Sequence, residues 1–221
     1  MTLILDRITC RRSGHTVIRD LSAEIAAGQV TALRGPNGVG KSTLLRTIAG
    51  LIPPAAGDAT FADLSLTRDR SAFQEQVLYA GHLDAVKPAL GFRENLGLWA
   101  GLNGTDGPRV DAALAYFGLS FMADRPAGEG SAGQKRRLGL ARLMVSDRPL
   151  WLLDEPTVSL DTTSVALVAD LVRAHAASGG IALVATHADL GLGAIPVVQM
   201  TPPETLATPE TEPDPFLAGR W

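Results

Sequence analysis

The sequence predicts an α/β fold built around a parallel sheet, and two features of its apolar pattern support this prediction. Short continuous apolar runs recur along the chain, as expected for strands buried on both faces. Helical patterns lie between these runs, and alternating strands and helices are typical of an α/β fold. The predicted strands are Val30 to Leu33, Val77 to Ala80, Leu150 to Leu153 and Ile181 to Thr186.

The clearest predicted helix runs from Thr162 to Ser178. Its apolar side chains recur at helical spacing and fall near one face. Gly179 and Gly180 follow directly and supply a stop, because glycine readily takes the conformation that ends a helix. The predicted face consists of Val165, Val168, Leu171, Val172 and His175.

Residues 91–128 follow a different pattern. Helical pieces at about residues 94–101 and 110–118 occur there without a clear strand. We therefore expect a helical lobe, about residues 88–148, inserted into an α/β domain of residues 1–200. The tail, residues 201–221, is rich in proline, threonine and glutamate and is predicted to be disordered.

The composition argues against several classes of function. The 221 residues carry a formal net charge of −3, so no global positive field attracts nucleic acid or anionic lipid. The single cysteine, Cys10, rules out an internal disulfide and is expected to act as a small hydrophobe beside the first strand. The N-terminus does not resemble a signal peptide, and no apolar run reaches the roughly 20 residues of a membrane helix. We expect a soluble chain that reaches a membrane only through a partner.

The most specific feature is the stretch "GPNGVGKST", which matches the phosphate-loop pattern G-x-x-x-x-G-K-[ST] between a predicted strand and a predicted helix. Its backbone N–H groups would surround a phosphate at the helix N-terminus, whereas the alternative is a glycine-rich turn entering an ordinary helix. We expect Lys41 to reach the β- and γ-phosphates, Ser42 to ligate Mg²⁺ and Thr43 to lie on the α-phosphate side. The predicted loop comprises Gly35, Pro36, Asn37, Gly38, Val39, Gly40, Lys41, Ser42 and Thr43.

A second element, "PLWLLDEP", places two carboxylates directly after an apolar strand. At the carboxyl end of a buried parallel strand, such side chains emerge in the crevice where nucleotides bind. We expect Asp154 to hold Mg²⁺ through water and Glu155 to act as the general base for the attacking water. A solvated acidic turn is the alternative, and the upstream phosphate loop argues against it.

Three further motifs resemble those of the ATP-binding cassette (ABC) ATPases. "SAGQ", Ser131 to Gln134, resembles the signature sequence Leu-Ser-Gly-Gly-Gln. "SLD", Ser159 to Asp161, resembles the D-loop, and "ATH", Ala185 to His187, resembles the switch histidine. The resemblance covers about residues 3–200 and implies an ABC-type P-loop NTPase domain, with a RecA-like core, a small antiparallel β region and an inserted helical subdomain.

The resemblance also implies a mode of action with ATP and Mg²⁺ as cofactors. Ser131 and the Gly133 N–H, at a helix N-terminus, would donate to the γ-phosphate bound by a second copy, so the active form would be a head-to-tail homodimer. Gln134 and Asp161 belong to the same nucleotide-binding set. The implied catalytic residues are Lys41, Glu155 and His187, the last in contact with the γ-phosphate.

Four positions depart from the family pattern. Gly130 and Ala132 stand where the signature usually has leucine and glycine. Arg12 stands where an aromatic residue usually stacks on adenine, and a guanidinium can also stack on a π-face. His82 stands where the Q-loop glutamine is usual, although imidazole is a poorer Mg²⁺ ligand than an amide oxygen. Arg12 and His82 stay in the predicted nucleotide-binding set.

Together with "YAGH" and "SAGQKRR", these departures resemble the haem-exporting ABC ATPases of cytochrome c maturation. This implies a peripheral ATPase dimer at the cytoplasmic face of the bacterial inner membrane, working with an integral-membrane subunit and a haem-handling membrane protein. The membrane subunit is expected to dock between the helical lobe and His82. Candidate contacts are Leu83, Val86, Phe92 and Trp99, of which core packing explains the last two equally well.

Other functions stay open at this point. The chain also fits an ATPase of another small ABC exporter, a soluble ABC ATPase acting on nucleic acid, or a non-catalytic module with a degenerate cassette. The acidic net charge argues against nucleic acid, and we expect no nucleic-acid partner. The presence of all the expected catalytic side chains favours an active enzyme. "KRR", Lys135 to Arg137, is interpreted as a solvated helix face rather than a binding patch.

Overall fold

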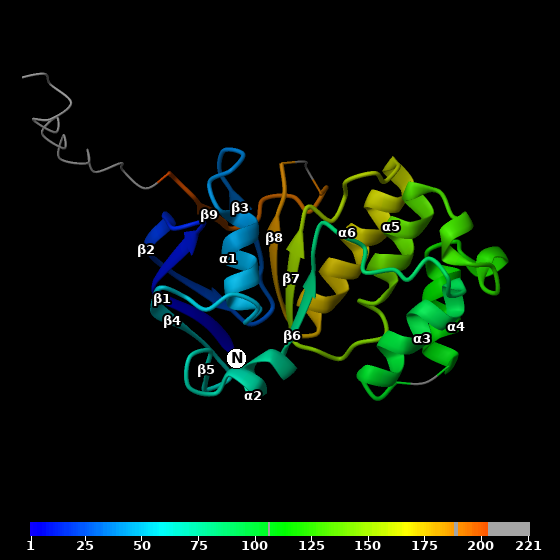
Figure 1. Cartoon of the computed structure of the whole chain (residues 1–221), viewed down its shortest axis with the longest axis horizontal. Coiled ribbons are helices and arrows are strands. Elements are labelled where there is room, and N and C mark those ends of the chain that lie inside the picture. Colours follow the sequence, from blue (N-terminus) through cyan, green and yellow to red (C-terminus); the bar gives the residue numbers. More distant parts are fainter. Residues whose placement is uncertain (106, 188–189, 203–221) are drawn as a thin grey trace, which may run out of the picture.

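The computed structural model describes residues 1–105, 107–187 and 190–202, and it contains two sheets. Figure 1 shows the strands in one half of the molecule and most of the helices in the other. The predicted disordered tail lies outside the described residues except for its first two positions, so that prediction is not tested.

The larger sheet is parallel throughout and has the strand order β6-β7-β8-β3-β9. Four of its strands confirm the predicted buried strands, and the short β9 was not predicted. Since the strands are parallel, their carboxyl ends lie at one edge of the sheet. The strands are β3 (Val30–Arg34), β6 (Val77–Ala80), β7 (Leu150–Asp154), β8 (Ile181–Ala185) and β9 (Val197–Gln199).

The smaller sheet is antiparallel, with the order β2-β1-β4-β5, and supplies the antiparallel region that the family resemblance implies. Ser13 and Gly14 form the turn between its two long strands, and both have positive φ, as a tight hairpin turn requires. Cys10 is buried here, as predicted, and burial raises the pKa of its thiol. The strands are β1 (Thr2–Arg12), β2 (His15–Ala26), β4 (Ala56–Phe61) and β5 (Leu64–Ser65).

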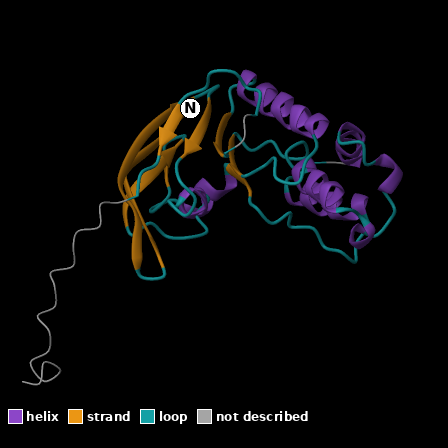
Figure 2. Ribbon diagram, turned by 90° about the horizontal axis from the view of Figure 1, so that it is seen from above, coloured by secondary structure: helices purple, strands orange, loops and turns teal. Residues whose placement is uncertain are grey.

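Helices α3, α4 and α5 pack against one another away from the antiparallel sheet (Figure 2). They contain the predicted helical pieces and lie within residues 88–148, while the division of the chain into a separate lobe stays a prediction. The helices are α1 (Lys41–Ile48), α2 (Arg70–Glu75), α3 (Phe92–Leu102), α4 (Gly107–Tyr116), α5 (Ala132–Ala141) and α6 (Thr162–Ala177), with 3-10 turns η1 (Ser120–Met122) and η2 (Ala127–Glu129).

The parallel sheet separates two cores because its side chains alternate between its faces. Leu150 and Leu152 of β7 pack on the side of α1 and the antiparallel sheet. Trp151 and Leu153 pack on the side of α6 and the helical lobe. Val168 and Val172 of α6 are fully buried against that second side, which confirms the predicted helix face. The sheet is therefore held rigidly from both sides, and so is the edge where its strands end.

Candidate active site

The phosphate loop connects β3 to α1 at this carboxyl edge. Gly38 and Gly40 have φ of 81° and 109°, in the left-handed region that favours glycine. Gly40 is also the N-cap of α1, and a Cβ there would lie 3.1 Å from the side chain of Ile18. The first turn of α1 contains no acidic residue. The loop thus directs N–H groups and the positive end of a helix at one point, where an anion is stabilised.

Lys41 places a buried positive charge in the same loop. Its side-chain Nζ donates to the carbonyls of Gly35 and Pro36, at 2.9 and 3.1 Å, and lies 2.9 Å from His187 Nε2. Because an ammonium can only donate, Nε2 accepts in this contact and the imidazole is neutral. All three partners are uncharged, so the positive charge of Lys41 is not neutralised within the loop. This charge fits the binding of a nucleoside triphosphate.

The first predicted carboxylate, Asp154, is 1% exposed at the end of β7. Ser42 Oγ donates to its Oδ1 at 2.9 Å, and the Tyr79 hydroxyl donates to its Oδ2 at 3.2 Å. A carboxylate and a hydroxyl oxygen next to the phosphate loop are the oxygen ligands that Mg²⁺ prefers. The pair Ser42 and Asp154 therefore fits a cation that bridges the protein and the phosphates.

The second predicted carboxylate, Glu155, follows Asp154 directly, and its side chain lies near His187. Its φ is 48°, a conformation that is uncommon for residues other than glycine and is concentrated at functional sites. Its backbone N–H donates to Ala185 O at 2.8 Å, and its Oε1 lies 3.7 Å from His187 Nε2. The turn thus brings Glu155 beside His187, which in turn contacts Lys41. The structure gathers five predicted residues from three segments of the chain, Lys41, Ser42, Asp154, Glu155 and His187.

The signature turn is built at the N-terminus of α5. Ser131 is the N-cap, and it forms a reciprocal capping box with Gln134, with bonds of 3.2 and 2.8 Å. A Cβ on Gly133 would lie 3.2 Å from Ser159 O, so this turn packs against the D-loop. Asp161 ends that loop as the N-cap of α6, and hydrogen bonds from Ser164 lower its pKa. Ser131 and Asp161 are both exposed, and the bonds described for Ser131 join it to α5 rather than to the phosphate loop.

The structure explains the two departures from the usual signature sequence, Gly130 and Ala132. A Cβ on Gly130 would lie 2.8 Å from the ring of Phe92, which is fully buried. Phe92 thus fills the space that a side chain at position 130 would need. Ala132 is the first residue of α5 and does not have a positive φ, so glycine is not required there.

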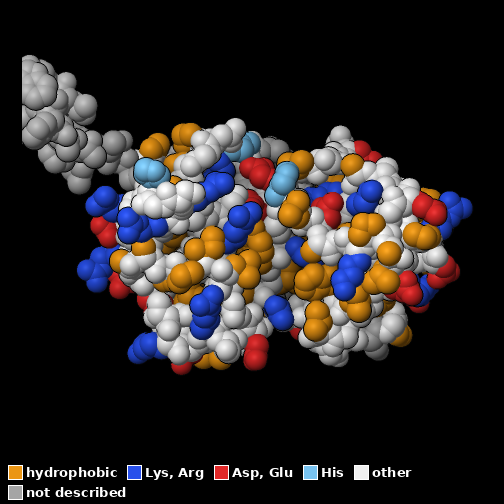
Figure 3. All heavy atoms as spheres, viewed as in Figure 1, with side chains coloured by type: hydrophobic (Ala, Val, Ile, Leu, Met, Phe, Trp, Pro, Cys, Tyr) orange, Lys and Arg blue, Asp and Glu red, His pale blue; other side chains and the backbone are white. Residues whose placement is uncertain are grey.

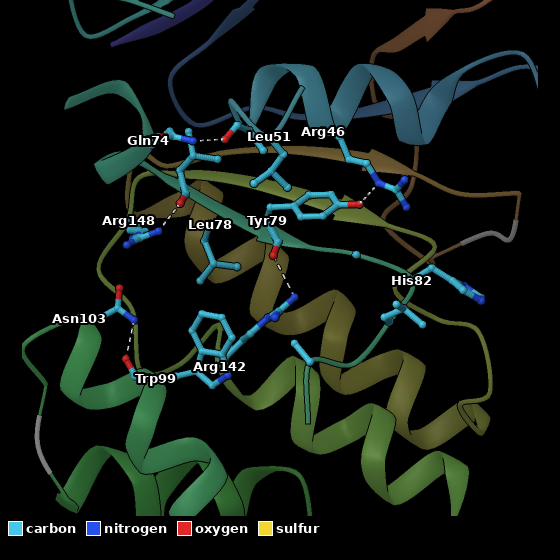
Figure 4. Close-up of a pocket in the computed structure, with 15 residues that line it drawn as sticks. Arg46, Leu51, Gln74, Leu78, Tyr79, His82, Trp99, Asn103, Arg142 and Arg148 are labelled. Carbon is cyan, nitrogen blue, oxygen red and sulfur yellow. Dashed lines mark hydrogen bonds between the residues drawn. The ribbon is translucent and has the colours of Figure 1, made fainter. Parts of the chain in front are cut away.

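Arg12 and His82 are not brought to the cluster around Lys41 by any described contact. Arg12 is exposed at the end of β1, opposite His15 in the hairpin. His82 is exposed after β6, and Figure 4 shows its imidazole directed away from Tyr79 and Arg142. The nucleotide-binding roles of both residues stay predictions.

The interpretation of "KRR" as a solvated face is wrong for Arg136, which is 4% exposed. Its guanidinium donates to Glu155 O at 2.6 Å and to Gly81 O at 3.0 Å, and it forms an ion pair with Asp84 at 3.0 Å. Arg136 therefore joins α5, the segment after β6 and the backbone of Glu155. The signal in the sequence was its spacing of four residues from Leu140, which places both on the inward face of α5.

A cavity of about 420 Å³ lies between the strand-rich half and the helical lobe (Figure 4), in the region where Figure 3 shows a hollow between the two halves. Leu83, 81% exposed, and Trp99 line it, whereas Phe92 belongs to the core. Arg142 lies beneath Trp99, 5.1 Å from the ring centroid, and burial lowers its pKa to about 10. Three of the residues that line the cavity are arginines, and none is acidic. The lining consists of Arg46, Ala49, Leu51, Gln74, Val77, Leu78, Tyr79, Gly81, His82, Leu83, Ala85, Trp99, Asn103, Arg142 and Arg148.

Comparison with known proteins identifies the class. A family model described as ABC transporter matches residues 18–158, more than half of the chain. The fold is similar to a dimeric ATP-binding cassette in a post-hydrolysis state bound to ADP and Pi, with a TM-score of 0.79 and 21% identity over 90% of this chain and 94% of that one. A putative ABC transporter ATP-binding protein from Pyrococcus furiosus gives a TM-score of 0.79 and 22% identity over 90% of this chain and 98% of that one. This chain belongs to the ABC transporter family of ATP-binding proteins.

Closer relatives place it more finely within the family. A protein of Cereibacter sphaeroides is 49% identical over 98% of both chains. One of Rhodobacter capsulatus is 51% identical over 91% of this chain and 89% of its own. Both are named cytochrome c biogenesis ATP-binding export protein CcmA. Within the ABC family, the chain belongs with the CcmA proteins.

Replacing Arg136 with Met tests its structural role. The change leaves the buried carbonyl of Gly81 and the partly buried carbonyl of Glu155 without the Arg136 donor, and an unsatisfied buried group costs about 1 to 3 kcal/mol. We expect the free energy of unfolding to fall by about 3 kcal/mol or more, measured by urea denaturation. The control is Arg137→Met, which loses one described bond, to Phe117 O, and should cost about 1 kcal/mol. Equal losses in the two variants would contradict the assignment.

Proposed function

We propose that the chain is the ATP-hydrolysing subunit of an ABC complex for cytochrome c maturation. It would act as a head-to-tail homodimer on the cytoplasmic face of the bacterial inner membrane, and power haem export or the release of a haem-loaded chaperone. The relatives named CcmA support the process, and the cluster of Lys41, Ser42, Asp154, Glu155 and His187 is the observation that supports hydrolysis.

In this function the phosphate loop binds the triphosphate and Lys41 neutralises charge on its outer phosphates. Ser42 and Asp154 would hold Mg²⁺, which supplies further charge neutralisation at the phosphates. Glu155 would accept a proton from the attacking water as general base, and its carboxylate lies beside His187, which contacts Lys41 of the loop. His187, in contact with Lys41, would donate to the γ-phosphate through a ring nitrogen that carries a proton.

Two exposed residues of the single chain, Ser131 and Asp161, support the proposed dimer. Ser131 caps α5 at the surface, and the N-terminus of a helix stabilises an anion. In a head-to-tail dimer, this turn of one copy faces the phosphate loop of the other. The exposed Asp161 on the adjoining D-loop would lie in the same interface.

The integral-membrane subunit would dock in the cavity between the two halves. No helix in the described ranges is long and apolar enough to cross a bilayer. The cavity offers the exposed Leu83 and the half-buried Trp99 beside basic side chains. A haem-handling membrane protein completes the proposed complex.

Replacing Glu155 with Gln tests the general base. The amide keeps the size of the side chain but does not accept a proton, so we expect ATP hydrolysis to fall by roughly 10²- to 10⁴-fold while ATP binding persists and a dimer accumulates. Glu75→Gln, an exposed change at the end of α2, is the control and should keep the wild-type rate. Hydrolysis at the wild-type rate in Glu155→Gln contradicts the assigned role.

Replacing Lys41 with Ala tests the biological process. In a bacterium whose own CcmA gene is deleted, the wild-type chain should restore c-type cytochromes, detected by haem staining, and the variant should not, because it lacks the charge that neutralises the phosphates. Immunoblotting verifies equal amounts of the two chains. Normal cytochromes with the variant would favour the ATPase of another small ABC exporter.

Replacing Leu83 with Glu tests the docking face. A charge in place of this exposed apolar side chain should reduce co-purification of the co-expressed integral-membrane subunit by roughly 10-fold, without changing ATP binding by the isolated chain. Phe121→Glu is the matched control, because Phe121 is 67% exposed and lines neither this cavity nor its neighbour along α3. Equal recovery with both variants would place the membrane subunit on another surface.

A further inference from the structure

Tyr79 connects the cavity with the acidic end of β7. It is the third residue of β6, next to β7 in the sheet, and it is half-buried. Its ring lines the cavity, where Figure 4 shows it beside Arg46 and close to Leu78 and Leu51. Its hydroxyl lies at the opposite end of the ring, 3.2 Å from Asp154 Oδ2. One side chain therefore contacts both the proposed docking face and the proposed cation site.

The direction of these hydrogen bonds is determined by their partners. Arg46 Nε can only donate, so the phenol oxygen accepts from it at 3.3 Å. The one phenol hydrogen is then available for Asp154 Oδ2, an ionised carboxylate that can only accept. A guanidinium that donates to a phenol increases the polarity of its O–H bond, so the chain from Arg46 through Tyr79 to Asp154 is mutually supportive.

The two oxygens of Asp154 are held by different partners. Ser42 Oγ holds Oδ1 and Tyr79 holds Oδ2. At 1% exposure the carboxylate has little access to water, so the loss of one donor leaves an oxygen without a partner or lets the group rotate. If Ser42 Oγ ligated a cation, Tyr79 would be the remaining described donor that fixes the plane of the carboxylate.

We propose that Tyr79 is a positioning residue for the cation site, holding Asp154 through Oδ2 so that Oδ1 stays directed at Ser42 and the bound metal. The inference rests on the proposed ATPase function, since it requires a nucleotide with its divalent cation. It gives a role to Tyr79, which is not among the predicted nucleotide-binding or catalytic residues. Hydrogen-bond partners of metal ligands typically change metal affinity by 10- to 100-fold when removed.

The two tyrosines of the chain provide a matched pair of variants. Tyr79→Phe keeps the ring that lines the cavity and removes only the hydroxyl. Tyr116→Phe removes a hydroxyl that donates to Leu167 O at 2.9 Å, between α4 and α6. If Tyr79 served only as packing, the phenylalanine variant would bind metal as the wild type does.

The experiment measures metal coupling rather than turnover. The affinity of the full chain for a fluorescent non-hydrolysable ATP analogue is measured with EDTA and with saturating Mn²⁺, and the ratio of the two affinities reports the contribution of the metal. We expect this ratio to be about 10-fold smaller in Tyr79→Phe than in the wild type, with the EDTA affinity unchanged, and Tyr116→Phe to match the wild type. Thermal denaturation verifies that the three proteins are equally folded.

The possible outcomes distinguish the proposed ATPase function from the proposed role of Tyr79. A wild-type chain that does not bind the analogue, or gains nothing from Mn²⁺, overturns the proposed ATPase function. A wild type that gains from Mn²⁺ while Tyr79→Phe gains equally overturns the role of Tyr79 alone. An equal loss in Tyr116→Phe overturns it as well, because the effect would then be a general consequence of losing a phenol.

Discussion

The hydrogen bond from Ser42 Oγ to Asp154 Oδ1, 2.9 Å long, is the contact on which the site depends. It joins the first turn of α1 to the end of β7, two segments that are more than a hundred residues apart in the sequence. The sheet order makes it reachable, because β8 alone separates β7 from β3 and all three strands end at one edge. A buried carboxylate requires hydrogen-bond donors, so the same bond that stabilises Asp154 also aligns the acidic strand end with the phosphate loop.

Arg136 holds the second member of the acid pair, Glu155, by donating a hydrogen bond to its carbonyl. Glu155 has a left-handed backbone conformation, which costs of order 1 to 3 kcal/mol and persists only where the surroundings determine it. Its N–H is held by Ala185 of β8 and its carbonyl by the Arg136 guanidinium. Because Arg136 belongs to α5, the position of Glu155, the proposed general base, depends on the helix that the signature turn begins. Within one chain, the signature helix α5 is therefore connected to the backbone of Glu155 by a hydrogen bond.

Much of the fold was predictable because the strands of the parallel sheet are buried on both faces and appear as continuous apolar runs. The long strands β1 and β2 lacked such a signal, since one face of each is exposed and bulges interrupt their alternation. At the site, the phosphate loop and the acidic pair were predictable because each is a local pattern with its own chemistry. Arg136 was misinterpreted as solvated although its spacing from Leu140 indicated the inward face of α5. Tyr79 was missed because its partner, Asp154, lies far away in the sequence.

The contacts also account for a histidine where the family usually has the Q-loop glutamine. The segment after β6 lines the cavity with Gly81 and His82, and the carbonyls of both residues accept hydrogen bonds from Arg136. Arg136 in turn holds the carbonyl of Glu155, so this connection between the cavity and Glu155 runs through main-chain oxygens. A carbonyl is the same whichever side chain stands at position 82. The exchange of an amide for an imidazole therefore leaves this main-chain connection intact.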